Sequence, residues 1–297
     1  MGEISVRILV EGEEALVEAF LLPRLDSSML LFGNIQARGL AYQGQRYEGI
    51  YAGAFDGPQL IGVVAHYWNQ NLILQASSHI KALVRTVSNA SGRPLGGLLG
   101  PNEQVQEAKE VLDLSHSDLR HDEVEKLYSL ILNELEVPDL LIRNRVRGRL
   151  ARSGDIDLLA KWRIAYLSET MDEPETSSLE QSSRQAIKGQ IAEGRTWVIE
   201  RKDEPMATSS FNASVQNATG VGIVQVGGVW TPPALRSQGY GRAAVATSLV
   251  DARASGIQKA VLFTGEGNIA AQKAYSALGF KHIGAYRLTF LHQPLAL

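Results

Sequence analysis

The chain has 297 residues, which at roughly 150 residues per domain is enough for about two domains. Hydrophobic residues make up 44% and charged residues 21%, so disorder of the whole chain is excluded. The net charge of −3 argues against a dedicated nucleic-acid-binding protein. The lack of cysteine excludes disulfides, thiolate metal sites and a cysteine acyl-enzyme.

No segment of the sequence predicts a membrane-directed protein. Residues 1–3 lead directly into an alternating apolar pattern, without the basic and apolar regions of a signal peptide. The longest charge-free run, residues 205–235, contains three prolines and many polar residues, so it is not expected to cross a bilayer. We therefore expect a cytoplasmic protein without a membrane partner.

The first half alternates short strands and helices around clear turn signals. Asp56-Gly57-Pro58 predicts a turn between two strands, and Ala90-Ser91-Gly92 predicts the end of a helix. The strands expected are residues 47–55, 60–68, 72–75 and 95–99. The helices expected are residues 80–87 and 102–112, the second capped by Asn102.

The second half repeats this order of elements. The strands expected are residues 196–200, 206–211, 221–230, 260–264 and 282–291. The helices expected are residues 155–168, 241–254 and 268–278. Gly256 and Gly279 stand where a left-handed residue would end a helix, and Asn268 stands where a side-chain cap would begin one.

Between the halves the pattern is more basic, and we place the domain boundary near residue 140. Residues 142–152 alternate apolar side chains with arginines, which predicts a solvated edge strand; a contact to phosphate or to an acidic partner is the alternative. The acidic residues after His116 predict the opening of a helix that runs to residue 132. His116 and His121 do not share a face of such a helix, so we expect no metal site.

The segment 226–246 carries the strongest functional signal. A β-branched strand leads into Thr231-Pro232-Pro233 and must leave its neighbour just after Trp230, because two prolines cannot lie inside a sheet. A glycine-rich turn then opens a helix, and its backbone N–H groups and the helix N-terminus favour an anion. This turn predicts a pyrophosphate cradle, formed by Arg236, Ser237, Gln238, Gly239, Tyr240, Gly241 and Arg242.

Two other interpretations of this turn remain. Gly239, Gly241 and Ala244 have the spacing of a dinucleotide fingerprint, but the strand ends too far upstream and Asp251 and Glu266 miss the expected acidic position. A glycine-rich turn without any ligand is the second alternative.

With its downstream segment, the cradle resembles the GNAT acetyltransferase superfamily. Arg236-x-x-Gly239-x-Gly241 after a strand resembles the motif that holds the pyrophosphate of acetyl-coenzyme A. The segment from Asn268 through Tyr275 to Leu278-Gly279-Phe280 resembles the second family signature. The match covers residues 142–292. The first half has the same order of elements but carries Ser77-Ser78-His79 in place of the cradle, so it resembles a degenerate copy.

The resemblance implies an α/β (α+β) fold with two such domains, residues 1–140 and 141–297, each a mixed, mostly antiparallel sheet flanked by helices. It implies acetyl-coenzyme A as donor and no metal. Tyr275 would give a proton to the departing thiolate, for which a phenol is a suitable acid; a merely structural tyrosine is the alternative. Asn268 would cap its helix and contact the coenzyme, with capping alone as the alternative. Pantetheine would pair with Val229, Trp230 and Thr231.

The general base cannot be assigned from the sequence. Relatives often carry a glutamate on the strand before the cradle, where this chain has Gln225, which cannot accept a proton. Glu169, Glu173 and Glu266 could serve directly or through water, although a surface role is the simpler interpretation of each. Without cysteine, or a serine in a nucleophile turn, direct transfer is favoured.

These observations predict an N-acetyltransferase that acts on a primary amine, either a small molecule or a peptide. A non-catalytic acyl-coenzyme A sensor or scaffold is the alternative, because of Gln225. The first half would complete the acceptor side or cover the edge of the catalytic sheet. No nucleic-acid partner is expected, and a homodimer remains open.

Overall fold

The structure is a computed structural model that describes residues 3–216, 220 and 222–297. It divides into two compact units: unit 1 contains Met1–Leu127 and Gly284–Leu297, and unit 2 contains Tyr128–Ile283. The division therefore differs from a single boundary near residue 140. Two long strands, β6 (Leu119–Ile131) and β12 (Lys281–Leu295), each run from one unit into the other.

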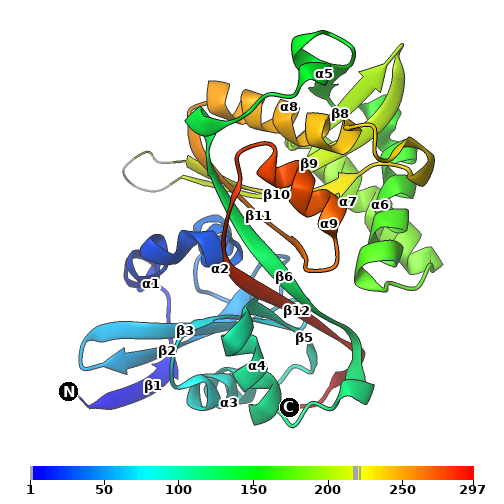
Figure 1. Cartoon of the computed structure of the whole chain (residues 1–297). Coiled ribbons are helices and arrows are strands. Elements are labelled where there is room, and N and C mark those ends of the chain that lie inside the picture. The colour runs from blue at the N-terminus through cyan, green and yellow to red at the C-terminus, as the bar shows by residue number, and fades with distance from the viewer. Residues whose placement is uncertain (1–2, 217–219, 221) are drawn as a thin grey trace. The chain divides into compact units, whose positions relative to one another are not determined.

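Unit 1 is built on a mixed sheet with the strand order β1-β2-β3-β4-β5-β12-β6 (Figure 1). The β4–β5 pair is parallel, and the pairs β1–β2, β2–β3, β3–β4 and β5–β12 are antiparallel. Its first five strands are β1 (Ile4–Ile8), β2 (Gly49–Asp56), β3 (Gln59–Tyr67), β4 (Asn71–Ala76) and β5 (Leu95–Pro101). The expected strands of the first half are thus confirmed.

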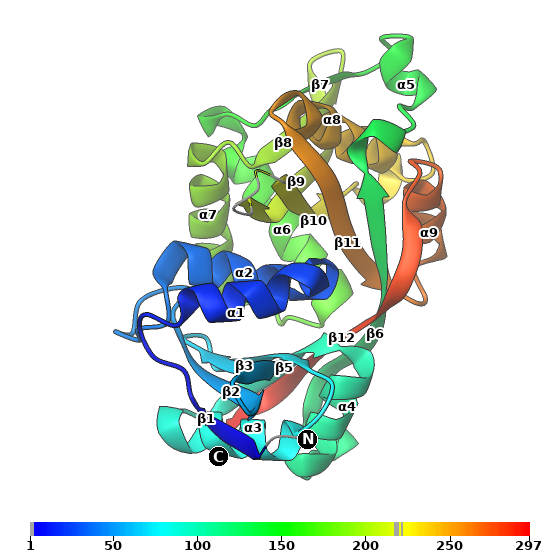
Figure 2. The same cartoon turned by 90° about the vertical axis from the view of Figure 1, so that its left-hand side faces the viewer.

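Helices cover both faces of this sheet (Figure 2). They are α1 (Glu14–Leu21), α2 (Leu25–Arg38), α3 (Ile80–Ser91) and α4 (Asn102–Val111), with short 3-10 turns at Leu22–Arg24 and His116–Asp118. Leu83 of α3 and Val105 of α4 are fully buried against Leu72 and Leu74 of β4, which fixes one face of the sheet. The two helices expected in the first half are confirmed.

The helix expected from residue 116 to 132 is wrong. This segment is a 3-10 turn capped by Ser115, followed by the long strand β6. Side chains alternate along β6, and Leu119, His121, Glu125 and Leu127 are buried on one face. Two of these four buried residues are polar or charged, and they conceal the two-residue period of the strand in the sequence.

The strands of unit 2 have the order β6-β11-β10-β9-β8-β7. The β10–β11 pair is parallel, and the pairs β7–β8, β8–β9 and β9–β10 are antiparallel. The strands are β7 (Arg147–Leu150), β8 (Thr196–Arg201), β9 (Glu204–Gln216), β10 (Gly222–Trp230) and β11 (Ile257–Gly265). Val221, the expected first residue of β10, lies outside the described residues. The mixed, mostly antiparallel strand arrangement with flanking helices confirms the predicted fold class.

The separation of β10 from its parallel neighbour begins earlier than the prolines predict. Within the described residues, pairing with β11 ends at Gln225, opposite Val261, whereas pairing with β9 continues to Trp230. Two register shifts interrupt the β9–β10 pair in this stretch, and Gly228 has a φ of +57°. Bulges of this kind bend a strand, so β10 turns away from β11 before the prolines are reached.

The helices of unit 2 lie on both sides of its sheet. They are α5 (Asp139–Ile142), α6 (Ile156–Met171), α7 (Ser177–Ala192), α8 (Tyr240–Ala254) and α9 (Ile269–Ser276), with 3-10 turns at Leu132–Glu134, Ser153–Asp155 and Pro233–Leu235. Leu159 of α6 and Ile187 of α7 pack against Val198 of β8 on one face. Ala243 of α8 packs with Ile199 on the other face. Helix α7 occupies part of a region for which the sequence predicts no regular structure.

The basic strand expected over residues 142–152 is largely wrong. Only Arg147–Leu150 form a strand, and α5 precedes it. This strand is the edge of the sheet, as expected, but Arg149 is not solvated. Its side chain is about 10% exposed and pairs with Asp155 at 2.7 Å and with Glu200 at 2.6 Å. The arginine therefore fastens the edge strand to β8 and to the start of α6.

Most of the predicted helix ends are confirmed. Gly92, Gly256 and Gly279 all have positive φ values, and the Asn268 side chain accepts a hydrogen bond from the Ala271 N–H at 3.1 Å. Asn102 does not cap α4, because it is the first helical residue and follows Pro101. Its side chain instead accepts a hydrogen bond from Arg287 at 3.2 Å.

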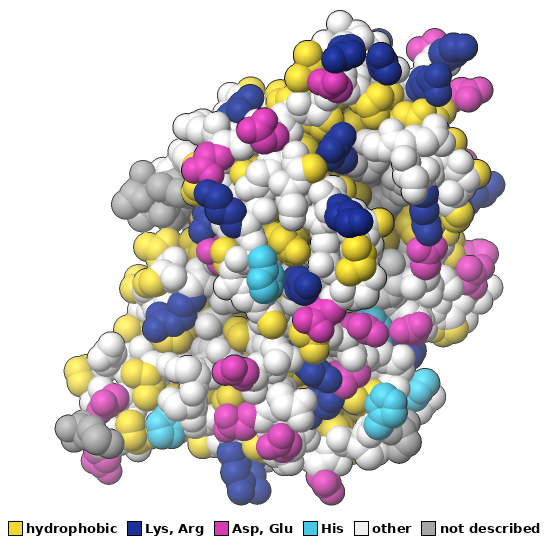
Figure 3. All heavy atoms as spheres, viewed as in Figure 1, with side chains coloured by type: hydrophobic (Ala, Val, Ile, Leu, Met, Phe, Trp, Pro, Cys, Tyr) yellow, Lys and Arg dark blue, Asp and Glu magenta, His cyan; other side chains and the backbone are white. Residues whose placement is uncertain are grey.

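Within the described residues, no helix is both long and apolar enough to cross a bilayer. On the face shown in Figure 3, acidic and basic side chains are interspersed rather than gathered in a single-sign patch.

Candidate active site

The site begins where β10 ends and α8 starts. After Trp230 the chain passes through Pro232 and the 3-10 turn, then through Ser237 with φ +62° and Gly239 with φ +82°. Gly239 is the N-cap of α8 and makes no side-chain cap. The first N–H groups of an α-helix lack partners within the helix and carry the positive end of its dipole. These groups fit an anionic ligand.

Two glycines allow the backbone to come close at this point. A Cβ on Gly241 would lie 3.1 Å from Oγ1 of Thr231 and 3.9 Å from a methyl group of Val229. A Cβ on Gly239 would lie 3.2 Å from a methyl group of Leu140, in a backbone conformation that other residues rarely adopt. The start of α8 is therefore packed directly against the end of β10.

Arg236 ties the cradle to two neighbouring elements. Its Nε donates to the carbonyl of Thr231 at 3.1 Å, and its Nη2 donates to Oε2 of Glu169 at 2.8 Å. The guanidinium also lies over the ring of Trp230, with 4.8 Å between its central carbon and the ring centroid. Arg236, the residue predicted to bind the pyrophosphate, therefore lies at the turn and is paired with the carboxylate of Glu169.

Arg242 adds a second cation at the start of α8. Its Nε is buried and has no hydrogen-bond partner among the described residues. A buried donor without a partner costs free energy, so a ligand that accepts a hydrogen bond here would relieve that cost. The uncapped N-terminus of α8, with Arg236 and Arg242 beside it in the sequence, is compatible with a pyrophosphate.

The structure brings most of the predicted coenzyme residues together. Contacts within the site connect Val229, Trp230, Thr231, Arg236 and Gly241. Ser237, Gln238, Gly239 and Arg242 belong to the same turn and first helical turn.

Two predicted residues are placed differently from the rest. The Tyr240 side chain is buried, and its hydroxyl accepts a hydrogen bond from Arg201 at 3.2 Å, so only its backbone can face a ligand. Asn268 is exposed, and its side chain is engaged in capping α9.

Tyr275 lies in the core beside the end of β10. It is 8% exposed, with its ring centroid 6.4 Å from that of Tyr128 and 6.0 Å from that of Phe280. Val229 packs against the same apolar cluster. The aromatic packing holds the ring in place, and the proton-transfer role of Tyr275 stays a prediction.

The candidates for a general base differ in where they lie. Gln225 is 3% exposed and carries no ionisable group. Glu169 is engaged with Arg236. Glu266 is exposed, and its backbone carbonyl accepts a hydrogen bond from Gln272 at 2.7 Å.

Local sequence patterns did not predict how closely α6 is connected to the site. Tyr166 of this helix packs edge-on against Trp230, with 6.3 Å between ring centroids, and Glu169 follows one turn later. A signal was present, because Tyr166 and Glu169 are three residues apart and share a helix face. Their partners, Trp230 on β10 and Arg236 in the turn after it, could not be deduced from local spacing.

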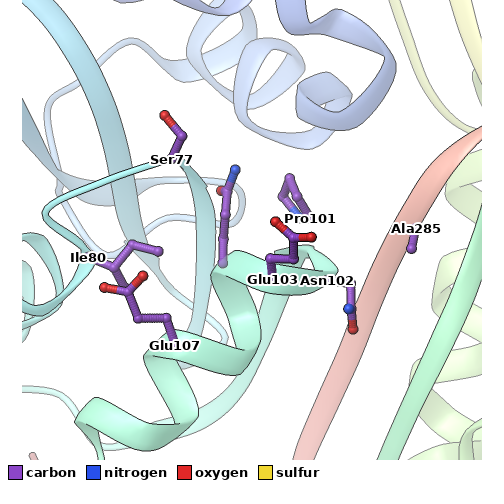
Figure 4. A pocket seen from close by; sticks show the side chains of 8 residues that line it. Ser77, Ile80, Pro101, Asn102, Glu103, Glu107 and Ala285 are labelled. Carbon is purple, nitrogen blue, oxygen red and sulfur yellow. The ribbon is translucent and has the colours of Figure 1, made fainter.

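Unit 1 has a corresponding turn between β4 and α3, with different chemistry. His79 precedes α3 with φ +60°, and the space between Ser77 and the start of α4 forms a pocket of about 330 Å³ (Figure 4). Glu103 and Glu107 line it, and neither Lys nor Arg does. Gln104 accepts a hydrogen bond from the Ala76 N–H at 2.8 Å. The pocket therefore disfavours a pyrophosphate.

Comparison with known proteins agrees with this geometry. Residues 160–280 match the Acetyltransferase (GNAT) family. A Drosophila protein of known structure aligns over 96% of this chain and 98% of its own, at 13% identity and a TM-score of 0.65. A GCN5-related N-acetyltransferase from Kribbella flavida aligns over 91% and 95%, at 17% identity and a TM-score of 0.57.

A GNAT-family acetyltransferase from Colwellia psychrerythraea also aligns over nearly its full length. The alignment covers 96% of this chain and 99% of that protein, at 15% identity and a TM-score of 0.55. No curated protein sequence matches the chain.

The whole chain therefore has the GNAT acetyltransferase fold. Residues 160–280, the part of the chain that matches the GNAT family, contain the cradle, α9 and Tyr275.

Proposed function

We propose that unit 2 transfers an acetyl group from acetyl-coenzyme A directly to a primary amine. The observation that carries the proposal is the N-terminus of α8, which has no side-chain cap and packs through Gly241 against Thr231 and Val229 at the end of β10. An anion at such a helix end is stabilised by backbone N–H groups and by the helix dipole. The pyrophosphate of the coenzyme would lie there, beside Arg236 and Arg242.

The edge of β10 would hold the rest of the coenzyme. Beyond Gln225, this strand no longer pairs with β11 in the described residues, while its other edge stays paired with β9 as far as Trp230. Backbone groups of Val229, Trp230 and Thr231 that face the open edge need partners, except the Thr231 carbonyl, which accepts a hydrogen bond from Arg236. The amides of pantetheine would supply them, and one N–H of this stretch would face the thioester oxygen.

Tyr275 would act as the acid of the reaction. Acetyl-coenzyme A supplies an activated thioester, and its thiolate needs a proton when the C–S bond breaks. The phenol of Tyr275 is suited to give that proton because the two groups have similar basicity. The chain has no cysteine nucleophile, which favours attack by the amine itself.

Calorimetric titration of the full chain with acetyl-coenzyme A tests the first half of the proposal. We expect micromolar binding, no binding of NADH, and loss of binding in an Arg236→Ala, Gly239→Ala double variant. An Arg184→Ala, Gly189→Ala double variant is the matched control, because Arg184 is an exposed residue of α7 and Gly189 has open space around its Cα. Binding that survives in the first variant, or no binding in the parent, contradicts the proposed site.

A non-catalytic acyl-coenzyme A sensor is the second candidate. Gln225, which offers no carboxylate beside the open edge of β10, favours it. Thiol release with a panel of primary amines separates the two functions. The panel includes glucosamine, because a fungal glucosamine N-acetyltransferase region aligns over 97% of this chain at 14% identity and a TM-score of 0.56. Coenzyme binding without thiol release from any amine supports the sensor.

A further inference from the structure

Gln225 carries an unusual unsatisfied group. Its side chain is almost fully buried, at 3% exposure, and its Oε1 has no hydrogen-bond partner among the described residues. A buried carbonyl oxygen without a donor costs about 1–3 kcal/mol relative to a satisfied one. A water molecule or a bound ligand can supply the missing donor at such a position.

Gln225 also lies where β10 separates from β11. It is the last residue of β10 that pairs with β11, and it faces Ala213 of β9 on the other side. Its neighbours Val224 and Val226 pack into the core beneath α8. Because side chains alternate along a strand, Gln225 lies on the opposite face, the side on which α6 packs against β10.

A second neutral amide lies beside it on the same strand pair. Asn212 is the extra residue of a bulge in β9, between Ala213, opposite Gln225, and Phe211, opposite Val226. Its side-chain amide lies against Gly227, and a Cβ on Gly227 would collide with it. Gly227 thus makes room for the Asn212 amide, two residues along β10 from Gln225.

We propose that Gln225 binds the acceptor substrate, with its amide oxygen accepting a hydrogen bond from an N–H of the primary amine. This inference rests on the proposed acetyl transfer. Half a turn of the terminal amide exchanges Oε1 and Nε2 in the same space, so the oxygen can meet an amine that approaches from either side. Gln225 is a positioning residue, and it takes no proton.

The proton balance of the transfer follows from this. The amine nitrogen forms the new C–N bond as the C–S bond breaks. The proton that the nitrogen loses goes to solvent, and the thiolate takes its proton from Tyr275, which regains one from solvent. Since an amide cannot act as a base, the amine must arrive deprotonated. The value of kcat/KM then rises with pH up to the pKa of the amine itself, about 10 for an alkylamine.

Two substitutions of Gln225 and one control test the assignment. Gln225→Leu keeps the approximate volume and removes the amide. Gln225→Glu supplies a carboxylate that can accept the proton. Gln75→Leu is the control, because Gln75 is also buried on a strand, in unit 1, but accepts a hydrogen bond from Ser27 at 2.8 Å. The probe for these kinetic tests is spermidine, an alkylamine.

In Gln225→Leu we expect the KM for the amine to rise about tenfold, with kcat within about threefold and the dissociation constant of acetyl-coenzyme A within about twofold. In Gln225→Glu we expect kcat/KM to rise about tenfold near pH 7 and to converge with the parent near pH 10. An unchanged KM in Gln225→Leu, or a pH profile unaltered by Gln225→Glu, overturns the inference.

A second measurement separates this inference from the proposed function. Spermidine and glucosamine are titrated into the protein saturated with coenzyme A, where no transfer occurs. Weaker binding of an amine to Gln225→Leu than to the parent supports the amine site even if no thiol is ever released. If the parent acetylates an amine, and Gln225→Leu binds and acetylates that amine like the parent, the proposed acetyl transfer is supported and the proposed role of Gln225 is wrong.

Discussion

The guanidinium of Arg236 and the carboxylate of Glu169 form an ion pair, with Nη2 and Oε2 2.8 Å apart. One partner belongs to the coenzyme cradle and the other to the last turn of α6, a helix that packs on β10. The pyrophosphate of a coenzyme and the carboxylate of Glu169 would compete for the same cation. The ion pair therefore couples coenzyme binding in the cradle to the interactions of Glu169 at the end of α6.

Removing this competition should strengthen coenzyme binding. The two side chains are 41% and 48% exposed, so their ion pair is worth no more than about 1 kcal/mol. Glu169→Gln should lower the dissociation constant of acetyl-coenzyme A about twofold to fivefold in calorimetry at low salt, and the gain should shrink at high salt. Glu134→Gln, which breaks the exposed pair with Lys281, is the control and should have no effect. Weaker binding in Glu169→Gln would show that the carboxylate positions Arg236 instead.

Three glycines of unit 2 should respond differently to alanine. Gly239→Ala places a Cβ at φ +82°, so it should lower the free energy of unfolding by roughly 1–2 kcal/mol and also weaken coenzyme binding. Gly241→Ala has no such strain, but its methyl group would fill the cradle beside Thr231. We therefore expect a loss of binding with little change in stability.

Gly189→Ala serves as the third member of this series. Gly189 stands inside α7, and a methyl group added there would meet no other atom within 4 Å. Alanine should raise stability by about 0.5–1 kcal/mol and leave binding unchanged. Denaturant unfolding and calorimetry on the same samples check all three. Equal loss of binding in Gly239→Ala and Gly189→Ala would mean that the cradle is not the binding site.

The local structure of the turn before α8 can be predicted from the sequence, whereas its surroundings cannot. Two prolines, two glycines and a following amphipathic segment determine a turn and a helix start within a short stretch, so Gly239 and the cap at Asn268 were placed correctly. The partner of Arg236 lies 67 residues away on α6. Contacts at that separation leave no periodic signal in one sequence.

Two errors have the same physical origin. In β6, His121 and Glu125 are buried on the apolar face, so the two-residue alternation is hidden and the acidic residues resemble the start of a helix. In α7, Ser183 and Ile187 are the residues buried, so the helix carries almost no apolar face.

The division between units differs from a single boundary near residue 140 because β6 and β12 each belong to both units. A cut at residue 140 would remove β12 from unit 1.

Replacing Tyr275 by phenylalanine should separate binding from turnover. The ring of Tyr275 packs against Tyr128 and Phe280, and phenylalanine keeps that packing. If the phenol protonates the thiolate, kcat should fall about 100-fold or more, while the dissociation constant of acetyl-coenzyme A stays within about twofold. Thiol release and calorimetry measure the two quantities. Unchanged kcat would assign Tyr275 to the core alone.

The stability of the protein should depend on the charge of Glu125. Burial and the nearby charge of Glu123 raise the pKa of Glu125 from about 4.5 to about 7 in the folded protein. The folded state therefore holds a proton that the unfolded chain releases near pH 4.5. As pH rises from about 4.5 to about 7 the free energy of unfolding should fall, by up to about 3 kcal/mol, because the carboxylate becomes charged while buried.

Glu125→Gln removes this dependence while it keeps the shape of the side chain. Denaturant unfolding between pH 4.5 and pH 8 should give a flatter profile than that of the parent, with the variant more stable at pH 8 and nearly equal at pH 4.5. Glu123→Gln is the matched control. It removes the repulsive neighbour, lowers the pKa of Glu125 and so shifts the fall in stability to lower pH. If Glu125→Gln is less stable than the parent at pH 8, the carboxylate is paired and charged at neutral pH, and its pKa is not raised.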